Sequence, residues 1–553
     1  MSFRFLPVLL LSVSIASACA QTQTLPTYDG LPLAERVQRI TSEPGVVRAH
    51  WGVRVTKQDG TPVFTMNDVQ LFQPASNAKL FTTAAAMALL GPDTTFATRV
   101  IASPLKPIHE GNLDGDLELV GDGDPNLSAT TLPYLSPAQR PKVDPDAPPV
   151  DPLRYLAQLA DKVAATGLKH IAGNVVGDDT LFPYEPYPED WSIDDAVWGY
   201  GAPVSALTIN DNLINIKLKP GAKVGDPITY ELSPAMPWYS IDTVDARTGD
   251  AKSGSHLAIE RMPDSRSIRI YGTIAVDSAP DAEELAINDP ADYAATAFKM
   301  LLEQRGIKVD GKPVSKHRLP QNEGSFTVEA RKPIDLPDAG LTMHRLPAFT
   351  DLHSLVKLNG DVFPSAAKNG NVVLASLTSQ TVATDMMLTN KISQNLHAEI
   401  FLHQLGAAFG NGSTLSGARV VRTFATQRAG VDPEDFIFFD GSGLSGHDLV
   451  TPRAITTLLQ YAATQPWFAT WKATLPVGGE DGTLRARFPG APMKDHVFAK
   501  TGTLSEARAL SGYIDCASGQ TLIFSVMVNA HTPRTSDDMK AMDRIVSAIA
   551  ATN

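Results

Sequence analysis

The sequence predicts an α+β fold, in which a domain with an antiparallel sheet flanked by helices is built from both ends of the chain and two smaller domains are inserted between them. Near the N-terminus, apolar residues alternate with others from Trp51 to Val55 and resume at Val63 after the turn Asp59-Gly60. The C-terminal part contains three strands in succession with short links, a pattern typical of antiparallel meanders. A chain of 553 residues is also too long for one compact core.

The pattern changes along the chain divide it into the following expected regions. They are a signal peptide at 1–20, the sheet domain at 25–95 and 345–553, an inserted α/β domain at 96–207 and 281–344, and an inserted β-rich domain at 208–280.

The N-terminal elements follow one another in a simple order. Residues 33–43 have the apolar spacing of a helix, and the hairpin over residues 51–65 comes next. Residues 75–90 are rich in Ala and Leu and predict a buried helix, which Gly91 is placed to end.

The middle of the chain mixes strands, loops and helices. The strand at Leu119-Val120 runs into a tight turn at residues 121–125, and seven prolines make residues 133–152 an exposed loop. A helix is expected over 153–168, a short strand over 171–176, and a helix over 291–304 after the β-rich region.

The C-terminal elements complete the predicted sheet domain. Helical spacing covers residues 382–409 and 452–463, with the apolar run 436–439 between them. The three successive strands are 497–503, 508–514 and 521–528, and a helix over 537–550 closes the chain.

Charge and composition exclude several kinds of partner. The net charge is −13 and no dense run of Lys or Arg offsets it, which argues against nucleic acid as the main partner. An acidic surface also has no electrostatic attraction to anionic lipid. A small or polymeric substrate is therefore expected.

The N-terminus has the features of an export signal. Arg4 provides a short positive region, residues 6–15 are mostly apolar but too few to span a bilayer, and Ala18-Cys19-Ala20 is a cleavage site of small residues. A retained membrane anchor and a lipoprotein signal with Cys19 lipidated are the alternatives. If Cys19 leaves with the signal, Cys516 is alone and no disulfide can form within the chain. With no CxxC or HExxH motif, a metal site has little support.

The pattern Ser-x-x-Lys, which can supply a nucleophile and its base, occurs four times. Residues i and i+3 share a face only in a helix, so the local structure separates the four. Ser76-Asn77-Ala78-Lys79 opens a long apolar helix, where free N–H groups favour developing negative charge. The other three begin at Ser103, Ser354 and Ser365, next to Pro or just before Asn-Gly, and have no long helix to follow.

A serine hydroxyl becomes a good nucleophile only when a base takes its proton. Lys79 can be that base if burial or a second cation destabilises its ammonium form, and Lys500 is the obvious second cation. The alternative is a serine at a helix start followed by a solvated lysine.

Two further motifs complete the set. Ser393-Gln394-Asn395 places Ser393 and Asn395 two residues apart, so only non-helical geometry lets both face one cleft. In Lys500-Thr501-Gly502-Thr503, Gly502 allows close approach of a substrate backbone, and Lys500 with Thr501 can hold a carboxylate. The alternatives are a pair of polar surface residues and an exposed strand end.

The three motifs together resemble those of the penicillin-recognising serine enzymes. The whole mature chain is similar to the D-alanyl-D-alanine carboxypeptidase/endopeptidase family, the low-molecular-mass class C penicillin-binding proteins, in which a large insertion separates the first two motifs. Further stretches look similar to that family: residues 121–125, 173–178, 202–206, 440–445 and 475–479. The resemblance implies a β-lactamase/transpeptidase-like sheet domain and no cofactor.

The resemblance also implies a role for each motif residue. Ser76 would form the acyl-enzyme, Lys79 would take its proton, and Ser393 would relay a proton to the leaving D-alanine nitrogen. The other implied contacts are Asn395 to Lys79 or the substrate amide, Lys500 and Thr501 to the terminal carboxylate, and the N–H groups of Ser76 and Thr503 to the oxyanion.

Two further sites come from the same resemblance. Leu504 and Ser505 are candidates to shape the pocket for the donor side chain. Asp178 matches an acidic position that meets the free amine of diaminopimelate, although Asp179 could serve instead and a plain surface turn is the alternative. His397 and His403 are expected to be structural. The proline-rich loop is either a surface loop or a cover over the cleft.

The implied activity is that of a periplasmic serine DD-peptidase acting on peptidoglycan stem peptides, with β-lactam antibiotics as inhibitors. Peripheral membrane association and a homodimer stay open. A serine β-lactamase is the first rival, but no second residue can be assigned to fast hydrolysis of the acyl-enzyme. A non-catalytic β-lactam-binding or wall-binding protein is the second rival, and a metallopeptidase is the weakest.

Overall fold

The computed structural model describes residue 26 and residues 28–104, 108–142, 144, 148–262, 264–336, 372–533 and 535–552. The expected signal peptide, Cys19 and the Ser-x-x-Lys motifs that begin at Ser354 and Ser365 lie outside these residues, as does Lys106 of the motif that begins at Ser103.

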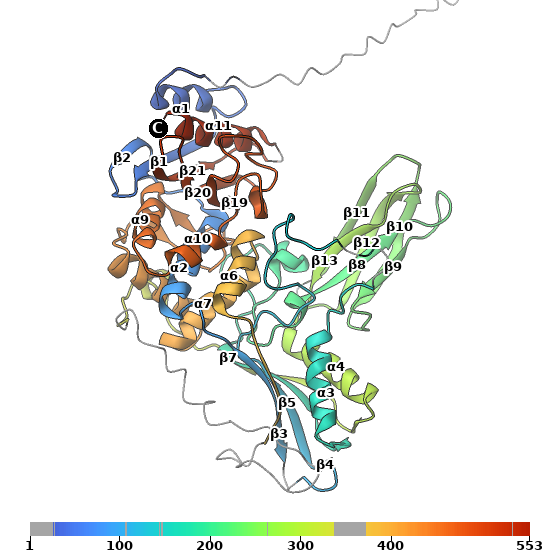
Figure 1. The fold of residues 1–553 in the computed structure, drawn as a ribbon. Helices are drawn as coiled ribbons and strands as arrows, with labels where there is room; N and C mark the ends of the chain where they lie inside the picture. Colours follow the sequence, from blue (N-terminus) through green and yellow to red (C-terminus); the bar gives the residue numbers. More distant parts are fainter. Residues whose placement is uncertain are drawn as a thin grey trace, which may run out of the picture.

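A five-stranded antiparallel sheet joins the two ends of the chain, in the order β19-β20-β21-β1-β2 (Figure 1). Its strands are β1 (His50–Lys57), β2 (Pro62–Met66), β19 (Val497–Thr503), β20 (Ala507–Asp515) and β21 (Thr521–Asn529). The predicted hairpin and the three successive C-terminal strands are confirmed. Long-range pairing of β1 with β21 closes the sheet, with Val53 opposite Val526.

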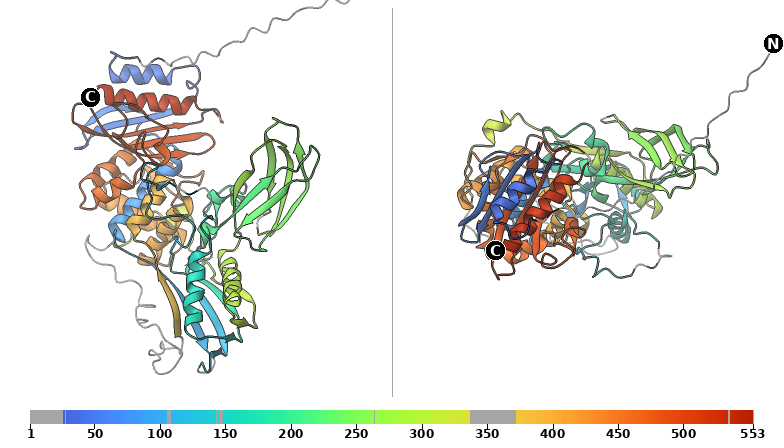
Figure 2. Two further views of the ribbon diagram at one scale, coloured as in Figure 1. Left: turned by 45° about the vertical axis from the view of Figure 1, so that its right-hand side comes forward. Right: turned by 90° about the horizontal axis from the view of Figure 1, so that it is seen from above.

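Both faces of this sheet are covered, which explains why its central strands are almost continuously apolar. Helices α1 (Leu33–Thr41) and α11 (Asp537–Thr552) cover one face, where Leu510 and Ile514 of β20 are buried (Figure 2). The alternate residues Ala509 and Tyr513 pack into the helical layer on the other face. The three-layer arrangement confirms the predicted fold class.

The helical layer contains the elements that follow the first hairpin and those that precede β19. They are η1 (Ala75–Ala78), α2 (Lys79–Leu89), α6 (Val382–Lys391), α7 (Asn395–Phe409), α8 (Thr414–Thr423), the π-helical turn η5 (Phe424–Arg428), α9 (Pro452–Ala463), α10 (Phe468–Thr474) and η6 (Gly482–Leu484), with the short strands β17 (Phe436–Ile437) and β18 (Leu449–Val450). Residues 79–87 of α2 are all buried, so this helix lies at the centre of the layer.

The first inserted part is built around a second five-stranded sheet, in the order β15-β7-β5-β3-β16. Its strands are β3 (Ala97–Pro104), β5 (Gly115–Val120), β7 (Val175–Pro183), β15 (Pro313–Arg318) and β16 (Val372–Thr378), and the helices α3 (Arg154–Ala165) and α4 (Pro290–Gln304) pack beside it. A small parallel sheet of β4 (Asn112–Leu113), β6 (His170–Ile171) and β14 (Lys308–Val309) flanks it. The strand expected over 171–176 is therefore divided, because β6 and β7 belong to different sheets.

Strand pairing differs from the predicted ranges at both edges of this insertion. Strand β16 falls inside the range predicted for the sheet domain, yet it pairs with β3 of the inserted sheet. Conversely, Phe326 of the short helix α5 (Phe326–Glu329) stacks on Phe439 of the helical layer, with ring centres 4.9 Å apart. We propose a boundary near residue 379 in place of 345, with α5 joined to the helical layer.

The second inserted part consists of two three-stranded sheets that project from the rest of the molecule (Figure 1). Its strands are β8 (Leu213–Lys219), β9 (Thr229–Ser233), β10 (Ser240–Gly249), β11 (Ser255–Glu260), β12 (Ser267–Ala275) and β13 (Asp281–Ala286), preceded by the turns η2 (Asp195–Val197), η3 (Gly199–Gly201) and η4 (Asn210–Asn212). Because β13 pairs with β8, this part continues beyond the predicted limit at residue 280.

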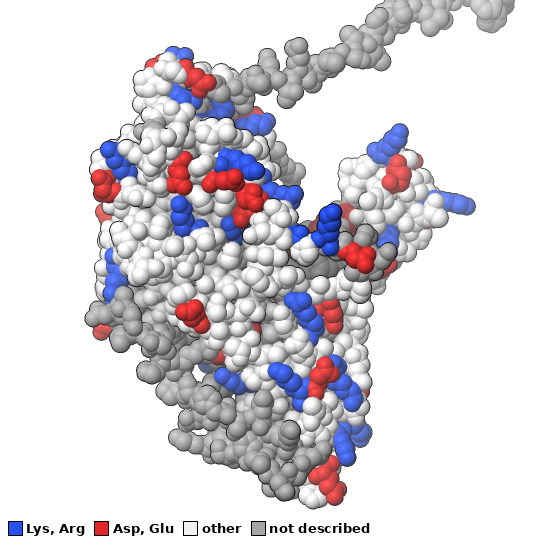
Figure 3. Space-filling view, viewed as in Figure 1, with Lys and Arg blue, Asp and Glu red and all other residues white. Residues whose placement is uncertain are grey.

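The surface in Figure 3 shows how charge is distributed on one face. Among the residues that the structure describes, Lys and Arg side chains there are interspersed with Asp and Glu and form no continuous basic surface. The β-rich part stands apart from the main body, and the surface is hollowed between them. No helix formed by the described residues is both long and apolar enough to cross a membrane.

Candidate active site

Ser76 lies in the turn η1, immediately before the buried helix α2. The preceding residue, Ala75, has a φ of 46°, a conformation that an L residue adopts at a cost. The chain therefore turns sharply into the helix at this point, and Ser76 stands at its N-terminal end, where unpaired N–H groups are available. This is the position that the sequence predicted for the nucleophile.

Lys79 is fully buried and its ammonium nitrogen touches three oxygens. Nζ lies 2.9 Å from Ser76 Oγ, 2.7 Å from Asn395 Oδ1 and 2.7 Å from the carbonyl of Ser442. An ammonium group has three N–H donors, so this set satisfies all of them. When the amine is neutral, its lone pair is within reach of the Ser76 hydroxyl proton.

Burial lowers the pKa of Lys79 from 10.5 to about 8, against the opposing effect of three buried carboxyl groups, those of Asp440, Glu399 and Asp448. Burial disfavours the charged ammonium, whereas a nearby carboxylate favours it. A lysine with a pKa near 8 is neutral in part of the population close to neutral pH and can accept a proton.

The second motif lies at a break between two helices. Helix α6 ends at Lys391, Ser393 has a φ of 65°, and α7 starts at Asn395, so the predicted continuous helix over 382–409 is interrupted here. The side chain of Gln394 accepts the N–H of Leu396 and caps α7. The break brings Ser393 next to Lys500 and Asn395 next to Lys79. The sequence predicted that both residues could reach one site only if the chain between them was not helical.

Lys500 lies on β19 with its side chain fully buried. Its Nζ is 2.8 Å from Ser393 Oγ and 2.9 Å from the carbonyl of Thr501. Burial, with the nearby charge of Lys79 as a second cause, lowers the pKa of Lys500 well below its usual value. The charge of Lys79 thus disfavours the charged form of Lys500, whereas the pKa of Lys79 itself is lowered by burial and not by the second cation that the sequence suggested.

Gly502 allows β19 to lie directly against the turn that carries Ser76. A Cβ atom at this position would be 2.4 Å from the carbonyl oxygen of Pro74 and 3.1 Å from the backbone nitrogen of Ser76. Any side chain would therefore push the strand away from Ser76.

The remaining residues of the third motif lie at the surface of the site. Thr501 is partly exposed, and its hydroxyl donates to Thr483 Oγ1 at 2.7 Å. Thr503 and Ser505 are exposed at the end of β19 and in the following turn, and Leu504 is partly exposed between them.

A carboxylate that the sequence did not assign, Asp440, shapes the floor of the site. It accepts the backbone N–H groups of four consecutive residues, Ser442 at 3.1 Å, Gly443 at 2.6 Å, Leu444 at 2.9 Å and Ser445 at 2.8 Å. The loop wrapped around Asp440 directs the Ser442 carbonyl at Lys79. The signal was present in the sequence, since residues 440–445 were among the stretches similar to the family.

The inserted part also reaches the site. The backbone carbonyl of Tyr200 accepts the side-chain amide of Asn395 at 2.9 Å, and the indole N–H of Trp191 donates to Asp440 at 2.9 Å. Neither residue was predicted, because only the fold brings positions so far apart in the chain together.

Asp178 is not among the residues that contact the motif side chains. Its carboxylate is buried, lies 2.7 Å from Lys316 Nζ and accepts both the N–H and the hydroxyl of Thr180. Its neighbour Asp179 contacts His317 and Ser205 instead. Both carboxylates are thus engaged inside the inserted part.

The other predicted features have simple structural settings. Ser103 lies on strand β3, where its hydroxyl donates to Glu118, so the motif that begins there is not helical. His397 is buried between Asp385 at 2.7 Å and Asp211 at 3.3 Å, and His403 contacts the carbonyl of Gly412. Within the described ranges, no group of three or more His, Cys, Asp or Glu side chains is arranged to hold a metal ion.

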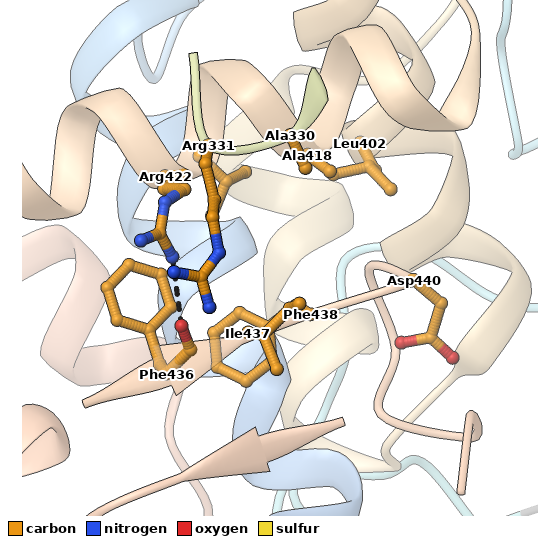
Figure 4. Close-up of a pocket in the computed structure, with 10 residues that line it drawn as sticks. Ala330, Arg331, Leu402, Ala418, Arg422, Phe436, Ile437, Phe438 and Asp440 are labelled. Carbon is orange, nitrogen blue, oxygen red and sulfur yellow. Dashed lines mark hydrogen bonds between the residues drawn. The ribbon is translucent and has the colours of Figure 1, made fainter. Parts of the chain in front are cut away.

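A small hollow lies behind the Asp440 loop (Figure 4). Arg331 and Arg422 stand at one end beside the ring of Phe436, and Asp440 lies at the other. Arg422 donates to the Phe436 carbonyl at 2.9 Å and Arg331 pairs with Glu434, so both cations already have partners. The hollow contains none of the three motifs.

Solved structures share this architecture. The crystal structure of penicillin binding protein 4 (dacB) from Haemophilus influenzae matches with a TM-score of 0.71 and 22% identity, over 94% of this chain and 99% of that one. A second structure of that protein, complexed with a β-lactam, matches with a TM-score of 0.67 and 21% identity, over 94% of this chain and 99% of that one. These similarities concern the fold.

Sequence comparisons give the family. The chain is 32% identical over 539 residues to the D-alanyl-D-alanine carboxypeptidase of an Actinomadura species, covering 95% of this chain and 85% of that protein. It is 24% identical over 526 residues to the D-alanyl-D-alanine carboxypeptidase DacB of Haemophilus influenzae, covering 95% and 91%. The model of the D-Ala-D-Ala carboxypeptidase 3 (S13) family matches residues 33–335 and 350–549. This chain therefore belongs to the D-Ala-D-Ala carboxypeptidase 3 (S13) family of serine peptidases.

Proposed function

We propose that the chain cleaves D-alanyl-D-alanine termini and D-alanyl-diaminopimelate cross-links of peptidoglycan through an acyl-enzyme on Ser76. The observation that carries the proposal is the position of Lys79 Nζ, buried and 2.9 Å from Ser76 Oγ, beside a second buried lysine. A serine and a lysine with a lowered pKa form the nucleophile and base that acyl transfer requires.

In the first step, neutral Lys79 takes the proton of the Ser76 hydroxyl while Oγ attacks the carbonyl carbon between the two D-alanines. The negative charge that develops on the carbonyl oxygen is held by the N–H groups of Ser76 and Thr503. The closeness of β19 to the Ser76 nitrogen, which Gly502 permits, supports this pairing of donors. One such donor contributes about a hundredfold or more in rate.

The leaving D-alanine nitrogen needs a proton when the peptide bond breaks. Ser393 supplies it from its hydroxyl and regains one through Lys500, whose Nζ is 2.8 Å from Ser393 Oγ. Before the second step, Lys79 releases the proton taken from Ser76 and Lys500 regains the proton passed to Ser393, so both lysines return to their starting forms. Water then attacks the acyl-enzyme while neutral Lys79 takes its proton, and Lys79 gives that proton to Ser76 Oγ as the ester bond breaks, which releases the shortened peptide with a new carboxyl group and restores the Ser76 hydroxyl.

The terminal carboxylate of the substrate binds at the Lys500–Thr501 end of the site. The buried Lys500 side chain provides positive charge, and the partly exposed Thr501 presents a hydroxyl to the substrate carboxylate. Asn395 bridges Lys79 and the Tyr200 carbonyl, so it holds the base in place. The side chain of Asn395 is partly exposed and can also contact the substrate amide. Ser505, exposed beyond β19, stays a candidate for the wall of the donor pocket.

Recognition of a diaminopimelate amine by Asp178 stays a prediction. Its carboxylate would have to exchange Lys316 for the substrate amine, since the two groups are 2.7 Å apart. Export to the periplasm, and inhibition by β-lactams that mimic the D-alanyl-D-alanine terminus, follow from the same proposal. They are supported by the family membership and, for β-lactams, by the contact of Lys79 with Ser76.

Intact-protein mass spectrometry with benzylpenicillin tests the proposal. We expect a stoichiometric, long-lived adduct on the wild type and on Ser103→Ala, and none on Ser76→Ala. Ser103 is the matched control because it begins a rival Ser-x-x-Lys motif on a strand. The wild type and Ser103→Ala should then release D-alanine from purified muropeptides, and Ser76→Ala should not. Rapid penicillin hydrolysis without an adduct would favour a β-lactamase, and neither adduct nor hydrolysis would contradict the assigned site.

A further inference from the structure

Tyr134, at the start of the proline-rich loop of the inserted part, reaches the edge of the active site. Its ring is buried, and its hydroxyl oxygen accepts the backbone N–H of Gly482 at 3.0 Å. Gly482 is followed directly by Thr483, whose hydroxyl holds that of Thr501 at 2.7 Å. Two hydrogen bonds and one peptide unit therefore connect the inserted part to the third motif.

The loop that carries Gly482 is fixed on its other sides by the sheet domain. Asp481 forms a buried ion pair with Lys391 at 2.6 Å and also accepts the N–H of Val477 at 2.9 Å. A Cβ on Gly482 would be 2.5 Å from the Lys391 carbonyl, and its φ is 56°, so the chain is pressed against the end of α6. Tyr134 supplies the contact on the N–H side of the same residue.

Tyr134 itself is held in a firm local frame. Residues 136–140 form a turn in which the N–H groups of Gln139 and Arg140 donate to the Ser136 carbonyl, and the Arg140 guanidinium lies 5.8 Å from the centre of the Tyr134 ring. Just before it, the Thr130 carbonyl accepts Arg154 of α3 at 2.9 Å. The chain on both sides of Tyr134 is thus held by hydrogen bonds, which fixes the position of the Tyr134 hydroxyl.

We propose that Tyr134 is a positioning residue for substrate recognition: through Gly482 it fixes Thr483, and through Thr483 it holds the Thr501 side chain in one rotamer. When substrate binds, the Thr501 hydroxyl turns its proton from Thr483 Oγ1 to the terminal carboxylate. The inference rests on the proposed role of Thr501. Thr483 is exposed, and the side-chain contact that the structure gives it is the one with Thr501. A hydroxyl kept in one rotamer before substrate arrives costs less to order on binding.

The experiment compares two chromogenic N-acyl-D-alanyl thioesters that differ only in the leaving group, one ending in a carboxylate and the other in its methyl ester. Wild-type enzyme should favour the carboxylate thioester in kcat/KM. Tyr134→Phe, which keeps the ring, should lower kcat/KM for the carboxylate substrate by about three- to tenfold through KM and leave the ester unchanged, the range expected for one neutral hydrogen bond.

Variants of the same chain of contacts sharpen the test. Thr483→Val should reproduce the carboxylate-selective loss, and Thr483→Ser should restore most of the wild-type preference. Tyr239→Phe is the matched control, because its hydroxyl makes a buried 2.6 Å bond to the Ala286 carbonyl in the β-rich part. It should leave the preference unaltered.

Two results would overturn the inference. An equal loss on both substrates in Tyr134→Phe would make the residue a general support of the fold, and no loss on either would remove it from recognition. If wild-type enzyme itself does not distinguish the two thioesters, while the Ser76 adduct forms, the carboxylate role of Thr501 is wrong and acyl transfer by Ser76 stands.

Discussion

The side-chain amide of Asn77 donates a 2.9 Å hydrogen bond to the backbone carbonyl of Lys500. Both residues are fully buried, so the bond forms away from competing water. It ties the residue after Ser76 to the strand that carries the second lysine. The proposed oxyanion site depends on the spacing between Ser76 and β19. This spacing is set by the Asn77–Lys500 hydrogen bond as well as by Gly502.

Replacing Asn77 should affect both stability and acylation. Asn77→Ala leaves the Lys500 carbonyl buried without this donor, which costs about 1–3 kcal/mol of unfolding free energy. The rate of acylation by benzylpenicillin should fall about tenfold or more as β19 shifts. Urea unfolding and stopped-flow acylation measure the two effects. The control Asn112→Ala removes an exposed side chain and should change neither; unaltered acylation in Asn77→Ala would contradict the proposed role of this bond.

A methyl group at Gly502 should block the reaction. In Gly502→Ala the new carbon would meet the Pro74 oxygen at 2.4 Å, so strand and turn must separate. Acylation should fall by about a hundredfold or more, since misplacement by about 1 Å has effects of this size. Gly490→Ala is the control, because a Cβ there meets nothing within 4 Å. Similar acylation rates for the two variants would show that the close approach is dispensable.

The acylation rate should follow the neutral form of Lys79. With its pKa lowered to about 8 mainly by burial, the rate should rise about tenfold per pH unit below pH 8 and level off above it. Stopped-flow measurement with benzylpenicillin from pH 6 to 9.5 gives the profile. A flat profile across this range would mean that Lys79 is not the rate-determining base.

Glu399 should make stability fall as pH rises. Burial, with Asp440 as a second cause, raises the pKa of Glu399 from 4.5 to about 8. Between these values the folded state binds a proton that the unfolded chain lacks, so unfolding becomes easier with rising pH. Glu399→Gln is neutral at every pH. Between pH 5 and 9 its unfolding free energy should therefore rise relative to that of the wild type by a few kcal/mol, on the order of magnitude that such a pKa shift represents. Parallel unfolding curves at all pH values would contradict this assignment.

His397 should stabilise the fold over a different window. Burial of His397 lowers its pKa, but the carboxylates of buried Asp385 and partly buried Asp211 outweigh this effect and raise the pKa from 6.5 to about 10. Its contribution is complete below pH 6.5 and disappears as pH rises through 10. The Tm deficit of His397→Gln should therefore shrink between pH 6.5 and 10. His109→Gln, at an exposed position, should show no deficit at any pH, and a constant deficit at His397 would refute the charged pair.

Helices and strands that are defined by the spacing of nearby apolar residues could be predicted from the sequence. The hairpin at β1 and β2, the buried helix after Ser76 and the three last strands were predicted because alternation and helical spacing are properties of short segments. The interruption at Ser393 was anticipated only as a requirement, since no residue there forces a positive φ.

The residues that the sequence missed are those whose roles depend on distant contacts. Tyr134 and Tyr200 reach the site from separate stretches of the inserted part, and nothing near them in the chain indicates their partners. Strand β16 was assigned to the sheet domain for the same reason, because its partner β3 lies far away in the sequence. The pairing of the motifs themselves was inferred through family resemblance.

The two ends of the insertion meet. The N–H of Ser379 donates to the Phe96 carbonyl at 2.8 Å, and the Ser379 hydroxyl accepts the Phe96 N–H at 2.8 Å. The chain thus leaves and rejoins the helical layer through two segments that lie side by side, and α5 within the insertion also packs on that layer through Phe326. A shorter chain that joined Phe96 directly to Ser379 would keep the path of the flanking segments. It would lose the contacts of Tyr134 with Gly482, of Trp191 with Asp440 and of Tyr200 with Asn395.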